Sequence, residues 1–171
     1  MDLNSILSAV TSAGSEQISK TTGADSSQVT DLLSSALPTL LGAMKNNAGD
    51  KSKAAGLSKA LDDHAQDDIT DVAAFLKTVD VEDGAKILKH LLGNDNEKIQ
   101  SKLADKSGLD ISQVATSLSS IAPLLLSFLG QQKQKSSNND LDLGSLIGGF
   151  IGGDNNIAET LMDGLSGFLK K

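Results

Sequence analysis

The chain of 171 residues contains no cysteine, no arginine, no tryptophan and no tyrosine. Without cysteine it can form neither a disulfide nor a thiolate metal site, and it holds no cysteine nucleophile. All 15 basic residues are lysine, and 22 acidic residues bring the net charge to −7. Nucleic-acid-binding proteins use basic patches to contact phosphates and arginine to read bases. The composition therefore argues against a nucleic-acid partner, and equally against electrostatic binding to anionic lipids.

Signals for secretion or for crossing a membrane are also missing from the sequence. The N-terminal stretch carries Asp2 and no positively charged region, which is not typical of a signal peptide. No continuous apolar run approaches the roughly 20 residues that span a bilayer. We therefore expect a soluble, cytoplasmic protein, with a core built from aliphatic side chains because aromatic residues make up only 2% of the chain.

Apolar residues recur at helical spacing, and no stretch alternates with a period of two, so the predicted fold class is all-α. Two of the helices are long and belong to an internal repeat described below. Three further helices are predicted between the repeats, at 50–65, 67–79 and 82–93. A short amphipathic helical segment is predicted before them at the N-terminus, with the apolar residues Leu3, Ile6, Leu7 and Val10.

The internal repeat has an offset of 85 residues. "GADSSQVTDLLSSALPTLLGAMKNN" (23–47) aligns without gaps to "GLDISQVATSLSSIAPLLLSFLGQQ" (108–132), with eleven identities in 25 positions. The chain has only two prolines, and they fall at equivalent places. In each half a short helix is predicted to end at a glycine, and an Asp-x-x-Gln sequence resembling a capping box then starts a long helix. The landmarks are Gly23, Asp25, Gln28 and Pro38, with Gly108, Asp110, Gln113 and Pro123 as their equivalents.

The long helix of the second repeat has the wider apolar face, so we predict that it is the more deeply buried of the two. A proline inside a helix removes a hydrogen bond and clashes with the preceding turn. We therefore predict that Pro38 and Pro123 mark matching bends in the two long helices. The alternative is that each proline is the first residue of a second helix, beginning at "PTLL" or "PLLL".

Composition divides the chain into a two-repeat helical domain (1–133), a polar linker (134–140) within the apolar-free stretch 131–140, and a C-terminal tail (141–171). The tail has glycines at 144, 148 and 152, a spacing that permits close helix approach. Its last part is amphipathic, and three interpretations stay open: it folds back on the core, it binds a partner helix or a second copy, or it lies on a membrane surface. The proposed interaction face consists of Ile157, Leu161, Leu165 and Phe168.

No motif in the sequence indicates catalysis. His64 and His90 are the only imidazoles, and neither has a recognisable serine partner. The acids around His64 do not have the spacing of a calcium loop, and we interpret them as a solvated turn between helices. "GGFIGGDNN" lacks the lysine and the preceding strand of a phosphate-binding loop. We therefore predict no catalytic, cofactor-binding or metal-binding residue.

Together the two "G-x-D-x-S-Q-V…L-S-S…P-x-L-L" segments, "DGAKILKHLLG" at 83–93 and the glycine-rich tail resemble the YidB-like bacterial family, the domain of unknown function numbered 937. The resemblance covers residues 1–133 well and the tail loosely. It implies a multi-helical fold with two related halves. It implies no activity, because the family is named for having none assigned.

The sequence thus predicts a non-enzymatic interaction or assembly protein, which binds a partner helix or itself through apolar helix faces and the tail. A nucleic-acid-associated protein is a competing hypothesis, because the short helix, glycine turn and long helix of each repeat resemble a helix-turn-helix. The acidic charge and the aspartates at the start of each long helix count against it. A peripheral membrane protein using residues 141–171 is a second competing hypothesis, and an enzyme ranks last.

Overall fold

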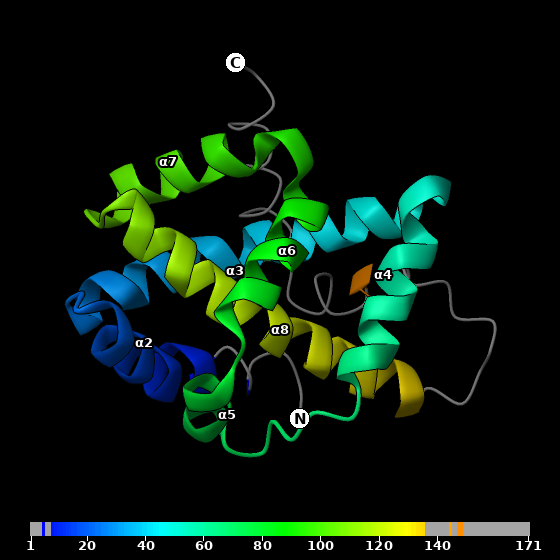
Figure 1. Ribbon diagram of the computed structural model, residues 1–171, viewed down its shortest axis with the longest axis horizontal. Coiled ribbons are helices and arrows are strands. Elements are labelled where there is room, and N and C mark those ends of the chain that lie inside the picture. The colour runs from blue at the N-terminus through cyan, green and yellow to red at the C-terminus, as the bar shows by residue number, and fades with distance from the viewer. Residues whose placement is uncertain (1–4, 6–7, 136–143, 145–146, 149–171) are drawn as a thin grey trace. The chain divides into compact units, whose positions relative to one another are not determined.

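The computed structural model describes residues 5, 8–135, 144 and 147–148. Within these residues every regular element is a helix, which confirms the all-α fold class. The elements are η1 (Val10–Gly14), α2 (Ser15–Thr22), α3 (Ser26–Gly49), α4 (Lys51–His64), α5 (Val72–Thr78), α6 (Val81–Leu92), η2 (Gly93–Asp95), α7 (Asn96–Ser107) and α8 (Ile111–Lys135), shown in Figure 1.

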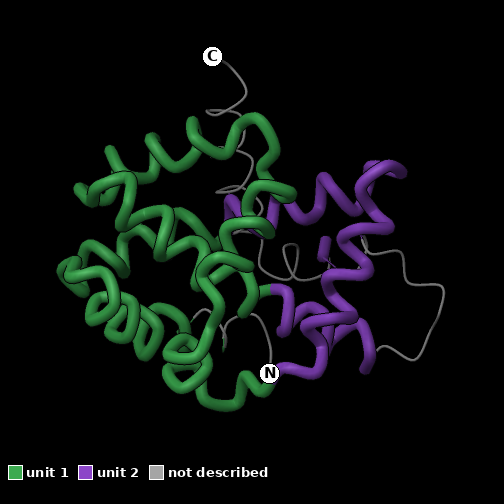
Figure 2. The backbone as a smooth tube through the Cα atoms, viewed as in Figure 1, with its two compact units in different colours: residues 1–37, 68–125 green, residues 38–67, 126–171 purple. Residues whose placement is uncertain are grey.

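The chain folds into two compact units, which Figure 2 distinguishes by colour. Unit 1 comprises residues 1–37 and 68–125, and unit 2 comprises residues 38–67 and 126–171. Each long helix contributes its first part to unit 1 and its second part to unit 2. The division falls directly before Pro38 in α3 and between Leu125 and Leu126 in α8. It therefore separates both repeats at nearly equivalent positions, close to their prolines.

Glycines end the two short helices, as the sequence predicts. Gly23 follows α2 with a φ of 73°, and its N–H donates to the carbonyl of Ser19. Gly108 follows α7 with the same φ, and its N–H donates to the carbonyl of Ala104. A left-handed backbone of this kind is strained for residues that carry a Cβ, so glycine at these two positions is explained by the backbone alone.

Aspartates begin the helices between the repeats. Asp50 caps α4, Asp71 caps α5 and Asp80 caps α6, each by accepting a backbone N–H from the first turn. The predicted start of the helix at 67 is wrong, because α5 begins only at Val72. Asp68 instead accepts from both the N–H and the hydroxyl of Thr70. A side-chain bond of this type competes with helix formation, and the stretch before Val72 is a turn for that reason.

The predicted apolar stripe of the first long helix is buried throughout, with each side chain at most 2% exposed. The second long helix goes further: every residue of α8 from Ser117 to Gly130 is buried. This confirms that α8 is the more deeply buried of the pair. The stripe in α3 consists of Val29, Leu32, Leu33, Ala36, Leu37, Leu40, Leu41 and Met44.

Both long helices continue through their prolines, with Pro38 inside α3 and Pro123 inside α8. The alternative in which a second helix begins at each proline is therefore wrong. Apolar residues on both sides of each proline are buried, and this burial outweighs the low helix propensity of proline. Matching bends at these positions stay a prediction.

Two predicted segment boundaries change or lie beyond the described residues. Residues 131–135 of the predicted polar stretch at 131–140 are the last turn of α8. Gln131 and Lys133 of this turn bind the end of α4 and the residues just after it, as described below. These bonds explain why a sequence without apolar residues stays helical. Residues 136–140 lie outside the described residues, so the linker at 134–140 and the domain bounds beside it stay predictions. Leu3, Ile6 and Leu7 lie outside the described residues, whereas Val10 is fully buried.

Candidate functional site

The two glutamines of the repeat motif bind the opposite repeat, and both contacts lie within unit 1. The Gln28 Nε2 donates to the carbonyl of Gly108 over 3.2 Å. The Gln113 Nε2 donates to the carbonyl of Thr22 over 3.4 Å. Gly108 and Thr22 end the short helices of the second and the first repeat, so the exchange is reciprocal. Each glutamine satisfies a carbonyl that the end of a helix leaves without an intrahelical partner.

The Asp-x-x-Gln capping box forms only in part in each repeat. In the first, the Asp25 carboxylate accepts from the N–H and the hydroxyl of Ser27, at 2.9 and 2.7 Å. Bonds from the Ser27 hydroxyl and then from its N–H hold the pKa of Asp25 below its ordinary value. In the second repeat the other half forms, because the Asp110 N–H donates to the Gln113 Oε1 over 3.1 Å.

Six of the eight repeat landmarks thus have a structural role. Two glycines end the short helices, and an aspartate and a glutamine of each repeat form hydrogen bonds at the start of the long helix: Gly23, Gly108, Asp25, Gln28, Asp110 and Gln113. The sequence places these residues correctly at helix ends but interprets the glutamines as local caps. It misses the cross-repeat bonds, which join residues 80 and 91 positions apart. The signal that points to them is the presence of a glutamine at the same position of both repeats.

Pro123 affects the packing of α8 against α6. Because proline has no N–H, the Ser119 carbonyl lacks its usual donor four residues later. A Cβ added at Gly84 of α6 would overlap that carbonyl oxygen and lie 2.6 Å from the Ser119 carbonyl carbon. The α6 backbone therefore meets α8 at the carbonyl that loses its usual donor to Pro123, and Figure 1 shows the crossing of the two helices. Such an approach suits a Cα–H···O contact.

A second glycine makes the same kind of contact in unit 2. A Cβ at Gly130 of α8 would overlap the Leu61 carbonyl oxygen and lie 3.1 Å from the Ala65 Cβ. Leu61 is in the last turn of α4, and the Ala65 N–H donates to the carbonyl of Asp62 instead. Both close approaches thus occur at carbonyls that lack the usual donor four residues later. The sequence does not single out Gly84 or Gly130 in this role.

His64 takes part in a polar cluster of unit 2 that joins the end of α4 to α8. One carboxylate oxygen of Asp67, Oδ2, lies 2.9 Å from the His64 Nδ1 and accepts the Ser127 hydroxyl at 2.9 Å. The Gln131 Nε2 donates to the Asp67 backbone carbonyl at 2.7 Å. Lys133 adds an ion pair with Asp62 at 2.7 Å.

These residue types are those of a serine hydrolase, but their connections are different. In a catalytic triad the serine bonds to the histidine, and the acid bonds to the other ring nitrogen. Here Ser127 donates to the acid itself, and it is fully buried in α8. The cluster fixes the turn after α4, which agrees with the interpretation of this segment as a turn between helices. His90 lies in the last turn of α6 and is exposed.

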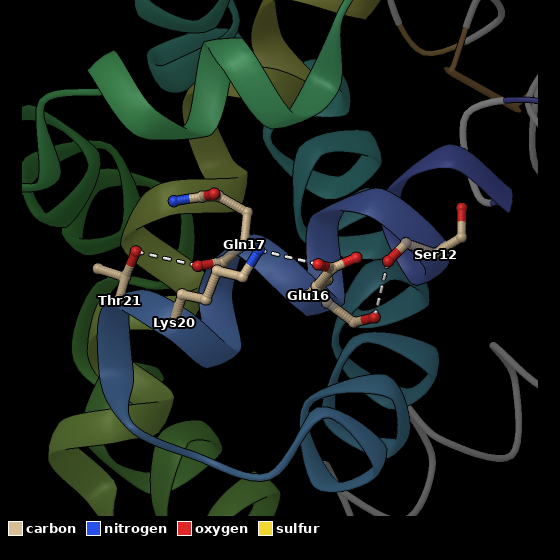
Figure 3. A network of polar contacts seen from close by, with 6 residues as sticks. Ser12, Glu16, Gln17, Lys20 and Thr21 are labelled. Atoms are coloured by element: carbon tan, nitrogen blue, oxygen red, sulfur yellow. Dashed lines mark hydrogen bonds and ion pairs between the residues drawn. The ribbon is translucent and has the colours of Figure 1, made fainter.

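Polar contacts on the surface of α2 are local. Lys20 pairs with Glu16 over 2.8 Å, and the Thr21 hydroxyl donates to the Gln17 carbonyl over 3.0 Å, as Figure 3 shows. Each partner lies one helical turn from the other, which is the ordinary pattern of a solvated helix face. Across the described part of the chain, no group of three or more His, Cys, Asp or Glu residues is arranged to hold a metal ion.

One described helix, α8, is long and apolar enough by length and composition to cross a membrane. Most of its apolar window is buried inside the protein, and a core helix meets the same criterion. Of the large hydrophobic side chains that the structure describes, only Ile111 is exposed, at 53%. The predicted interaction face, Ile157, Leu161, Leu165 and Phe168, lies outside the described residues.

A comparison of the sequence with known protein families decides the family of this chain. A family model described as "Bacterial protein of unknown function (DUF937)" matches residues 4–132. The chain belongs to this family. The match covers both repeats of the DUF937 protein and stops before the C-terminal tail. No curated protein and no solved structure matches the chain.

Proposed function

We propose that this DUF937 protein is a non-enzymatic assembly protein that binds a second copy of its own chain through the apolar face of residues 154–171. The same face would suit a helix of a partner protein. Ile157, Leu161, Leu165 and Phe168 follow one another at helical spacing, and this is the observation that carries the proposal. An isolated helix of this length is marginal in water, so it gains stability by burying such a face.

The described part of the two repeats supports this assignment by elimination. Its apolar side chains are used internally, with Ile111 as the one large exposed exception. The carbonyls at the ends of the two short helices are also used internally, by Gln113 and Gln28 of the opposite repeat. The proposal therefore places binding in the tail and not between the repeats.

Charge favours a second copy of the tail as the occupant. Residues 154–171 carry Asp154, Glu159 and Asp163 toward their N-terminal side, and Lys170 and Lys171 at the end. An antiparallel pair brings the lysines of one copy near the acids of the other. Burying an aliphatic or aromatic side chain contributes about 1.5–3 kcal/mol. Four per copy are enough to offset an association cost of several kcal/mol.

The helix-turn-helix hypothesis gains no support from the described contacts. The first turn of α3, which would face nucleic acid, has Gln28 bound to the opposite repeat and begins after Asp25. The net charge of −7 would repel phosphates from this surface. Enzymatic chemistry likewise has no supporting geometry in the cluster around His64.

Light scattering on the full chain tests the proposal. The variant Leu161→Asp/Leu165→Asp places two charges on the proposed face, and Ile111→Asp adds one charge at the exposed site on α8. We expect the wild type and Ile111→Asp to be oligomers, and the tail variant to have the monomer mass of 17.6 kDa. Adding anionic vesicles distinguishes the membrane hypothesis, which predicts that the wild type co-sediments with lipid. A monomeric wild type would contradict self-assembly.

A further inference from the structure

The first part of the tail, residues 141–153, is the glycine-rich segment, and three of its residues are described and belong to unit 2. Gly144, Ile147 and Gly148 are helical, and Ile147 is fully buried at 0% exposure. A Cβ at Gly148 would lie 3.8 Å from the Lys45 Cε and 3.9 Å from its Nζ. Lys45 is in the second part of α3, which also belongs to unit 2. Gly148 therefore lies beside the end of the Lys45 side chain, within the same unit.

The surroundings of Gly148 differ from those of Gly84 and Gly130. At Gly84 and Gly130 an added Cβ would overlap a backbone carbonyl, whereas the described atoms nearest to a Cβ at Gly148 are the end of the flexible Lys45 side chain, at ordinary contact distance. Burial singles out Ile147 instead, because a fully buried isoleucine is a main contributor to local packing.

Chain length permits this docking. The segment from residue 136 to 143 joins the end of α8 at Lys135 to Gly144. Eight residues span at most about 26–29 Å when extended. The connection therefore limits the sites on unit 2 that the glycine-rich segment can reach from the end of α8.

We infer that the residues around Ile147 dock on unit 2 beside Lys45 and hold the start of the tail there, leaving residues 154–171 to meet a second copy. The docking part stands on the described contacts alone, and the second part rests on the proposed function. The tail then has two uses: Ile147 completes the packing of unit 2, and the face from Ile157 to Phe168 binds outside it.

Hydrogen exchange on the full chain tests the docking. Backbone amides of 144–148 are expected to exchange at least about tenfold slower than in Ile147→Asp, because a docked helix opens only by local unfolding. Leu161→Asp/Leu165→Asp is expected to retain the slow exchange while losing the oligomer. Rapid exchange of 144–148 in both the wild type and the tail variant would overturn the inference without affecting self-assembly. Ile111→Asp is the control for an added charge elsewhere.

Thiol chemistry gives a second measurement, because the chain has no cysteine of its own. Lys45→Cys/Gly148→Cys carries two unique thiols, which a short bis-maleimide is expected to join within one molecule. Each single variant controls for bridging between copies. Links that form only between molecules would contradict the docking. Ile147→Ala is expected to lower the melting temperature by roughly 5–10 °C, from the cost of truncating a buried isoleucine in a chain of this size.

Discussion

Gly84→Ala tests the close packing of α6 on α8 directly. The added Cβ would overlap the Ser119 carbonyl oxygen and lie 2.6 Å from its carbon and 3.0 Å from the Ser119 Cα. Carbon atoms in contact normally lie about 3.5–4.0 Å apart. The two backbones must therefore move apart, and no side-chain rotation relieves the overlap because the atoms belong to the backbone. Leu88 and Leu92 follow Gly84 at four-residue spacing on the same face of α6 and are buried, so we expect the separation to loosen their packing as well.

The expected magnitude follows from two opposing effects. Overpacking of a core costs about 1–3 kcal/mol and occasionally more, and rigid backbone atoms place this site at the upper end. Alanine is favoured over glycine inside a helix by about 1 kcal/mol. We therefore expect Gly84→Ala to lower the free energy of unfolding by about 2 kcal/mol net.

Urea unfolding followed by far-UV circular dichroism measures the change, since the chain has no tryptophan to report by fluorescence. Gly56→Ala in α4 is the matched control, because a Cβ there has nothing within 4 Å. Gly56→Ala gains only the higher helix propensity of alanine, so its free energy of unfolding should rise by up to about 1 kcal/mol. If Gly84→Ala were as stable as Gly56→Ala, the close approach of the α6 backbone to the Ser119 carbonyl would be refuted.

Three further expectations use the same unfolding assay. Gly130→Ala should destabilise by about 2 kcal/mol, because its Cβ would overlap the Leu61 carbonyl of α4; a neutral result would contradict the second close approach. Gln28→Ala and Gln113→Ala should each cost about 1 kcal/mol by removing a cross-repeat bond, and no loss in either would argue against the pairing. Acid should also destabilise the protein: bonds from Ser52 lower the pKa of Asp50 below its ordinary 3.8, so this stabilisation is complete above pH 3.8 and is lost as the pH falls through the lowered value. Asp50→Asn should weaken that dependence, and an unchanged pH profile would contradict it.

The helices and their ends were largely predictable because they depend on local patterns. Apolar spacing defines α3 and α8, and glycine at 23 and 108 marks the left-handed ends of the short helices. The start of α5 was missed because Asp68 bonds to Thr70 and competes with the helix that the apolar spacing favours. A pattern of apolar residues does not include such a competing bond.

The contacts between distant segments were not predictable from the same patterns. Gln28 has a sufficient local explanation as a cap, so nothing in its own repeat points to Gly108. Gly84 resembles an ordinary residue of a helix start, and its role depends on where α8 crosses. Part of the signal was present: Pro123 implies an open carbonyl at Ser119, and an open carbonyl in a buried helix requires a close neighbour.

The proposed assembly depends on a face that the described residues do not include, so mass in solution tests it most directly. Light scattering should give the wild-type chain and Ile111→Asp a mass at least twice 17.6 kDa. Leu161→Asp/Leu165→Asp should return to the monomer mass while keeping its helical circular dichroism. A wild type that stays at 17.6 kDa across the accessible concentrations, or a tail variant with the oligomer mass of the wild type, would contradict the account.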